Sequence, residues 1–131
     1  MTCRPDPERD DRGAAVVDFV LVMVVLIPLF LGILQVGLVL HVRNTLTAAA
    51  SEGARYAATV DRGPADGVRR AKEQIRDAVA ADFASQVSAR QVSVRGVPGV
   101  RVVVAAEVPP LGLWGPAVRL EVNGHAVEEQ P

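Results

Sequence analysis

Residues 14–40, AAVVDFVLVMVVLIPLFLGILQVGLVL, decide the fold of this chain. Only Asp18 and Gln35 interrupt the apolar run. At about 1.5 Å of rise per residue, a helix of this length is roughly 40 Å long. The hydrocarbon core of a bilayer is about 30 Å thick. The sequence therefore predicts a single transmembrane helix near the N-terminus, with most of the chain on one side of the membrane.

A cleaved signal peptide is the main alternative to a retained anchor. A secretory signal usually has an apolar run of about 7–15 residues, which is shorter than this one. The flank HVRNTL at 41–46 also lacks a small-x-small cleavage pattern. Three arginines precede the run and two follow it closely, so the positive-inside rule weakly favours a cytoplasmic N-terminus. We therefore expect a single-pass protein of the cell membrane with an extracytoplasmic C-terminal domain.

The chain divides into four segments. Residues 1–13 are charged and contain two prolines, which predicts a disordered cytoplasmic leader. After the transmembrane helix at 14–40, the alanine-rich residues 41–60 are expected to extend the same helix into water, until Pro64 stops it. Residues 61–131 are long enough for one small domain.

This domain is expected to be α+β. Apolar residues recur at helical spacing over 65–88, which predicts an amphipathic helix. We expect that helix to pack on a sheet through Ile75, Val79 and Phe83. The fold class is thus a long pilin-like N-terminal helix, a second helix and a small antiparallel sheet.

The sheet is predicted from residues 91–127. Valines alternate with polar residues on both sides of Gly96-Val97-Pro98-Gly99, which indicates an antiparallel hairpin with its turn at 96–99. A proline-rich loop follows, in which Trp114 is expected to pack on the sheet; the alternative is an exposed contact for another subunit or the membrane surface. The last strand, at 117–127, either turns at Asn123-Gly124 or continues straight, and the continuous strand is favoured.

Composition argues against several classes of function. The net charge is −1, so there is no bulk attraction to nucleic acid. Cys3 is the only cysteine, which excludes an internal disulfide and a cysteine metal site. We expect its thiol to be solvated. His41 and His125 are far apart in the chain, and no catalytic or metal-ligand spacing stands out. The sequence therefore predicts no enzyme, no cofactor, no metal and no small-molecule substrate.

The apolar run and its flanks contain several short motifs in a fixed order. The charged leader ends in Gly13, directly before the apolar run. The segments that follow are Val17-Asp18-Phe19-Val20-Leu21, Ile27-Pro28, Gly32 to Gly37, and Ala49 to Ala58 with Glu52, Gly53 and Arg55. In their order and spacing these segments resemble the TadE-like family of the tight-adherence (Flp-type) pilus machinery, and the resemblance covers about residues 12–60.

The resemblance implies a pseudopilin or minor pilin that a prepilin peptidase cuts between Gly13 and Ala14. The implied partners are the lipid bilayer, other pilin or pseudopilin subunits and that peptidase. Two residues depart from the family pattern. Asp18, followed by Phe19, stands where the family usually has Glu, and Gln35 replaces a second acidic residue.

Asp18 has two interpretations. A carboxylate inside a membrane costs several kcal/mol, and cleavage would free an ammonium on Ala14, about one helical turn away. Asp18 is therefore predicted to pair with that ammonium in the same or a neighbouring chain. Alternatively, it lies about 6 Å into the run, at headgroup depth and without a role.

Four other motif positions also have structural interpretations. Pro28 removes a backbone hydrogen bond and is predicted to kink the helix. Glu52 and Arg55 are three residues apart and are expected to pair on one helix face. Gly53 is expected to cost the helix about 1 kcal/mol relative to Ala.

The leading interpretation is a non-catalytic component of a pilus assembly or secretion system. The second is a generic single-pass anchor that carries a small extracytoplasmic binding module and is neither processed nor assembled. A third is a substrate-recognition subunit of an envelope enzyme. Processing at Gly13 and assembly into filament-associated material distinguish the first from the second.

Overall fold

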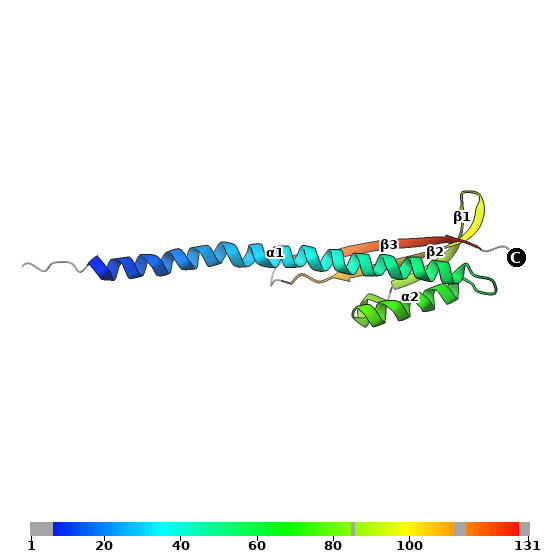
Figure 1. Ribbon diagram of the computed structural model, residues 1–131, viewed down its shortest axis with the longest axis horizontal. Helices are drawn as coiled ribbons and strands as arrows, with labels where there is room; N and C mark the ends of the chain where they lie inside the picture. Colours follow the sequence, from blue (N-terminus) through cyan, green and yellow to red (C-terminus); the bar gives the residue numbers. More distant parts are fainter. Residues whose placement is uncertain (1–6, 85, 112–114, 129–131) are drawn as a thin grey trace, which may run out of the picture.

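The computed structural model describes residues 7–84, 86–111 and 115–128, so the expectations for Cys3 and Trp114 lie outside the described residues. The architecture is the expected α+β one (Figure 1). The elements in chain order are α1 (Pro7–Ala57), α2 (Pro64–Ala78), the 3-10 turn η1 (Ala81–Ala84), β1 (Gln86–Val94), β2 (Val97–Val108) and β3 (Val118–Val127).

Helix α1 is a single helix of 51 residues that runs along most of the molecule (Figure 1). It begins at Pro7, so residues 7–13 are helical where the sequence predicted a disordered leader. Proline suits the first helical position, because its missing N–H would have no partner there. The helix ends at Ala57, and Asp61 in the following turn has a φ of 64°.

The three strands form one antiparallel sheet in the order β1-β2-β3. The predicted hairpin of β1 and β2 is present, but its turn lies at Arg95 and Gly96 and not at 96–99. Val94 pairs with Val97, and the two turn residues have φ values of 54° and 84°. A two-residue turn with both φ positive matches the twist of the strands, and so Pro98 and Gly99 become part of β2.

Strand β3 is continuous through Asn123 and Gly124, as the favoured alternative predicted. Gly124 lies where β3 crosses α1. A Cβ built on it would lie 2.5 Å from the carbonyl carbon of Ala50 and still closer to the backbone nitrogen of Ser51. The glycine of Asn123-Gly124 therefore allows β3 to pack closely on α1, and the pair does not form a turn.

The expected helix over 65–88 is too long. Helix α2 ends at Ala78, η1 follows, and Val87 pairs with Val104 in the sheet. The sequence between 78 and 87 contains no Gly or Pro that would stop a helix. Pairing with β2 provides backbone hydrogen bonds along β1, and this tertiary contact overrides a local helical pattern.

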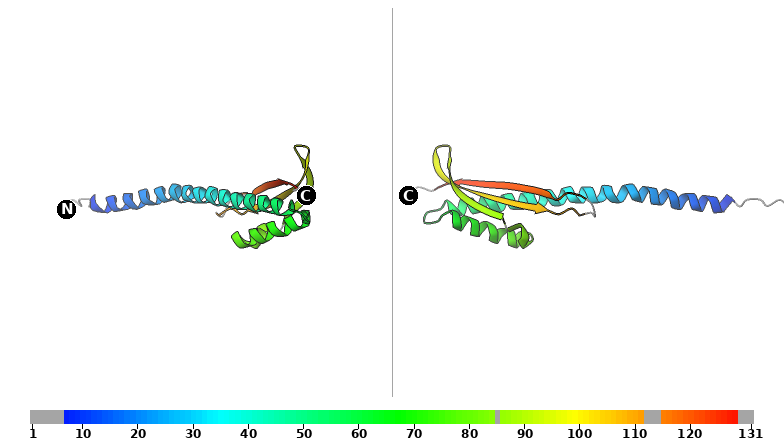
Figure 2. Two further views of the ribbon diagram at one scale, coloured as in Figure 1. Left: turned by 45° about the vertical axis from the view of Figure 1, so that its right-hand side comes forward. Right: turned by 180° about the vertical axis from the view of Figure 1, so that it is seen from behind.

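The core lies between one face of the sheet and the C-terminal half of α1, with α2 beside both (Figure 2). Val102 and Val104 of β2, Leu46 of α1 and Ile75 of α2 are fully buried. Residues 41–57 thus do not project freely into water, because this part of α1 supplies one wall of the core. Val79 and Phe83 pack against the core but are only partly buried.

Candidate functional site

The N-terminal half of α1 stands clear of the domain (Figure 1). The helix from Gly13 to Ala57 is long and apolar enough to cross a membrane. Large side chains such as Val16, Phe19 and Leu29 are more than half exposed along this half. Burial of apolar surface stabilises by about 25 cal/mol per Å², so a helix with this surface favours lipid over water. The chain is therefore a single-pass membrane protein.

The predicted processing site lies inside this helix. Gly13 and Ala14 are both exposed and helical. A Cβ built on Gly13 has no neighbour within 4 Å. A larger side chain at this position would therefore leave the rest of the protein undisturbed. The Gly13–Ala14 bond is part of a regular helix, so a peptidase that needs an extended substrate would have to unwind this end first.

Asp18 and Phe19 are exposed on the first half of α1. Asp18 lies four residues after Ala14, which places the two about one turn apart on one side of the helix. Phe19 has 61% of its surface exposed. The helix continues through Pro28 without interruption. The pairing of Asp18 and the kink at Pro28 remain predictions.

Gln35 joins α1 to the loop that follows β2. Its Nε2 donates to the carbonyl oxygen of Pro109 at 3.3 Å, and its Oε1 accepts from the backbone N–H of Leu111 at 2.8 Å. The partners are 74 and 76 residues away in the chain. The sequence marked Gln35 as an interruption of the apolar run and as a departure from the family pattern, but predicted no contact for it. The signal that could have revealed this contact is a lone amide side chain in an apolar run.

The segment around Gly53 forms the crossing of α1 and α2. A Cβ on Gly53 would lie 2.7 Å from the carbonyl oxygen of Gly67 and 3.0 Å from the Cβ of Ala71. Gly67 has the reciprocal relationship, at 2.7 Å from the carbonyl oxygen of Gly53 and 2.8 Å from the Cβ of Ala57. Glycine is needed at both positions for the backbones to approach, and sequence reasoning missed this role of Gly67.

Charged side chains surround this crossing. Glu52 Oε1 lies 3.7 Å from Arg70 Nη2 of α2, so Glu52 pairs across the two helices instead of with Arg55. Arg55 is exposed. The guanidinium carbon of Arg62 lies 3.7 Å from the centre of the Tyr56 ring, a cation–π contact at the end of α1. These contacts are partly exposed and add little stability each.

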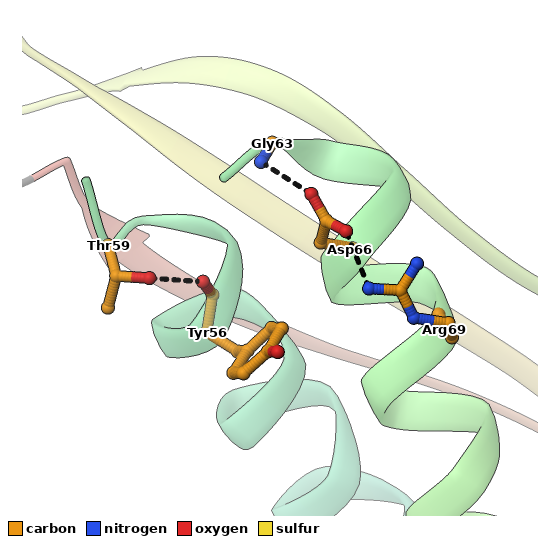
Figure 3. Close-up of polar contacts among 5 residues, drawn as sticks. All are labelled: Tyr56, Thr59, Gly63, Asp66 and Arg69. Atoms are coloured by element: carbon orange, nitrogen blue, oxygen red, sulfur yellow. Dashed lines mark hydrogen bonds and ion pairs between the residues drawn. The ribbon is translucent and has the colours of Figure 1, made fainter. Parts of the chain in front are cut away.

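The first turn of α2 is held by Asp66 (Figure 3). Its carboxylate accepts from the backbone N–H of Gly63 at 3.1 Å and from Arg69 Nη2 at 2.7 Å. The Gly63 hydrogen bond, followed by the Arg69 one, holds the pKa of the Asp66 carboxyl below its ordinary value. The same ion pair raises the pKa of Arg69. In the same view, the Thr59 hydroxyl donates to the carbonyl oxygen of Tyr56 at 2.8 Å and closes the end of α1.

Helix α1 thus has two parts. Its first half is apolar, exposed and suited to lipid, and its second half is packed in the domain. Among residues 7–84, 86–111 and 115–128, no group of three or more His, Cys, Asp or Glu side chains is placed to hold a metal ion. The motif residues divide accordingly. Gly13, Ala14, Asp18, Phe19 and Pro28 lie on the exposed half of α1. Glu52 and Gly53 lie at the helix crossing, and Arg55 follows them as an exposed residue.

Comparison with protein families finds a match to the model of the TadE-like protein over residues 13–55. This range covers the exposed half of α1 and its continuation as far as the α1–α2 crossing. The resemblance seen in the sequence is thereby confirmed. Comparisons with curated proteins and with solved structures found no match.

Proposed function

Because residues 13–55 form a TadE-like segment, we propose that this chain is a membrane-anchored pseudopilin or minor-pilin-like component of a tight-adherence (Flp-type) pilus assembly or secretion system. It has no catalytic role of its own in this proposal. The TadE-like match and the apolar helix support the role of a membrane protein associated with such a pilus system.

The main structural support for this proposal is that α1 is one continuous helix. One unbroken helix is exposed and apolar in its first half and forms a wall of the domain core in its second half. A subunit built in this way presents an apolar helix to lipid or to neighbouring helices while the domain stays attached without a linker. Other pilin or pseudopilin subunits are its proposed partners.

Processing by a prepilin peptidase is the second part of the proposal. Cleavage after Gly13 would leave Ala14 as the new N-terminus, with an ammonium about one turn from the Asp18 carboxylate. In a bundle of helices away from water, each charge would offset the cost of burying the other. The departure from Glu to Asp shortens the side chain by one methylene and leaves its charge unchanged.

Intact mass measurement tests processing directly. The protein is purified from cells with and without an active prepilin peptidase, and we expect a chain that begins at Ala14 only when the peptidase is active. Gly13→Val should accumulate the full-length form. Gly32→Val is the matched control, since a Cβ at Gly32 also has no neighbour within 4 Å. A wild-type chain that keeps its leader in the presence of the peptidase would refute this part.

The orientation proposed is a cytoplasmic N-terminus and an extracytoplasmic domain. Reporter fusions at residue 13 and after residue 131 would test it. A reporter that is active in the cytoplasm when fused after residue 131 contradicts the proposal.

The second candidate function is a generic single-pass anchor that carries a binding module. One observation favours it: the Gly13–Ala14 bond lies within a helix that begins at Pro7, where an extended substrate is not preformed. Retention of the leader in the mass measurement would select this candidate.

A further inference from the structure

The contact between Gln35 and the loop after β2 marks a particular depth along α1. Asp18 and Gln35, which interrupt the apolar run, are separated by about 26 Å of helix, and Ala14 and Gln35 by about 32 Å. A bilayer has a hydrocarbon core of about 30 Å. With α1 across the membrane, Gln35 lies at the boundary between the hydrocarbon core and the headgroups on the side of the domain.

The burial of α1 changes near the same position. Before Gln35 most of the large apolar side chains face outward, as Ile33 does with 63% of its surface exposed. Just after it, Leu38 and Val39 pack against the domain core, and Val42 is fully buried in it. The domain therefore begins within about two turns of the hydrocarbon boundary, without a spacer between them.

The loop segment that reaches Gln35 is suited to an environment with little water. Pro109 and Pro110 have no backbone N–H. The backbone N–H of Leu111 donates to Gln35, and the carbonyl of Pro109 accepts from it. Irregular backbone near hydrocarbon is tolerated where its polar groups have partners. The Leu111 side chain has 49% of its surface exposed beside this contact.

We propose that Pro109–Leu111 is a membrane-contact site whose ligand is the headgroup–acyl boundary of a phospholipid bilayer, and that Gln35 is the residue that positions it. The site is continuous with the exposed apolar surface of α1, which is what selects lipid as its occupant. The proposal requires only that α1 crosses the membrane. It does not depend on processing or on assembly into a filament.

The side-chain amide of Gln35 matches the hydrogen-bonding needs of the loop, which a carboxylate would not. It supplies one donor, for the Pro109 carbonyl, and one acceptor, for the Leu111 N–H. A carboxylate of the same shape accepts but does not donate unless it is protonated. Gln35→Glu should therefore release the loop at neutral pH and restore the contact on acidification.

The test uses the full chain in phosphatidylcholine vesicles. Leu111→Cys in a Cys3→Ser background is labelled with an environment-sensitive fluorophore. Quenching is measured with spin-labelled lipids and, separately, with aqueous iodide. The matched control is Ser93→Cys, an exposed position near the β1–β2 turn, at the far end of the domain from the membrane half of α1.

We expect lipid quenching at position 111 and iodide quenching at position 93. Gln35→Glu should lower lipid quenching at 111 by about twofold or more at neutral pH, because the loop loses its hydrogen-bond donor. Recovery in acid would identify Gln35 as the positioning residue, since a general loss of folding would not reverse in this way. Zwitterionic lipid keeps the membrane charge constant across that pH range.

Two outcomes would overturn the proposal. Iodide quenching at 111 equal to that at 93, with no lipid quenching, would place the loop in water. Protection of 111 from both quenchers that disappears on dilution into excess lipid would show that a second copy of the chain covers the site. Neither outcome bears on the pilus-associated role, which is tested by processing.

Discussion

Gly53 and Gly67 approach each other so closely that neither position has room for a side chain. A Cβ on either glycine would lie 2.7 Å from the carbonyl oxygen of the other. Their backbones touch where α1 and α2 cross. Gly53 lies in the TadE-like segment and Gly67 lies beyond it. The family segment therefore includes the surface on which the second helix docks.

Gly53→Ala should destabilise the domain, although alanine is the better helix former by about 1 kcal/mol. The added methyl group would meet backbone and the Ala71 side chain, and overpacking of this kind costs typically about 1–3 kcal/mol. Chemical unfolding of the full chain in detergent micelles measures the change. Gly37→Ala is the control, since a Cβ there has no neighbour within 4 Å. Equal stability of the two variants would mean that the helices do not cross at Gly53.

Ile75→Ala should be more damaging than Phe83→Ala. Ile75 is fully buried between α2 and the core, and truncation of such a side chain costs about 2–5 kcal/mol. Phe83 is only partly buried beside the core. Its truncation should therefore lower the free energy of unfolding by less than the value for a buried phenylalanine, which is about 3–5 kcal/mol. The same unfolding measurement ranks the two variants, and the reverse order would contradict the core described above.

Asp66→Ala should weaken the domain at neutral pH and have less effect in acid. The folded pKa of Asp66 is lowered, so its contribution is fully present above the unfolded value of about 3.9 and is lost as the pH falls through the folded value. Unfolding of wild type and variant at neutral pH and near pH 2 gives the comparison. Asp77→Ala, in the same helix, is the control. A difference between wild type and Asp66→Ala that does not shrink in acid would exclude a role for the ionised cap.

Asp18→Ala should separate processing from assembly. We expect cleavage after Gly13 to be largely retained, because the residues at the scissile bond are unchanged. Assembly should be lost, because the Ala14 ammonium would lack its partner in a low-dielectric helix bundle. Intact mass reports the first effect, and the amount of protein in sheared filament fractions reports the second. Asp18→Glu is the matched control, and it should keep both. Normal assembly of Asp18→Ala would support a solvated Asp18 without a role.

The long helix, the fold class and the last strand were predictable because their signals are local. An apolar run of this length has few alternatives, and alternation in β3 places Leu120, Val122 and Gly124 on the face that meets the helices. The boundary of α2 was not predictable in this way. Phe83 and Val87 fit a helical stripe, and only the partner strand determines that Val87 belongs to a sheet.

The contacts of the candidate site were harder to predict for the same reason. The role of Gln35 depends on two backbone groups more than 70 residues away, and the pairing of Glu52 with Arg70 depends on how two helices cross. A sequence shows that an amide or a glycine is unusual at its position. It does not show which distant segment makes that residue necessary.

The absence of any break in α1 from Pro7 to Ala57 has a mechanical consequence. The helix acts as a lever with its pivot in the bilayer. From Gln35 to Ala57 the arm is about 33 Å long, so a change in tilt of about 20° would swing the far end by roughly 11 Å. Torque applied to the domain would reach the lipid-embedded half directly, and a rotation of that half among its neighbours would turn the domain with it.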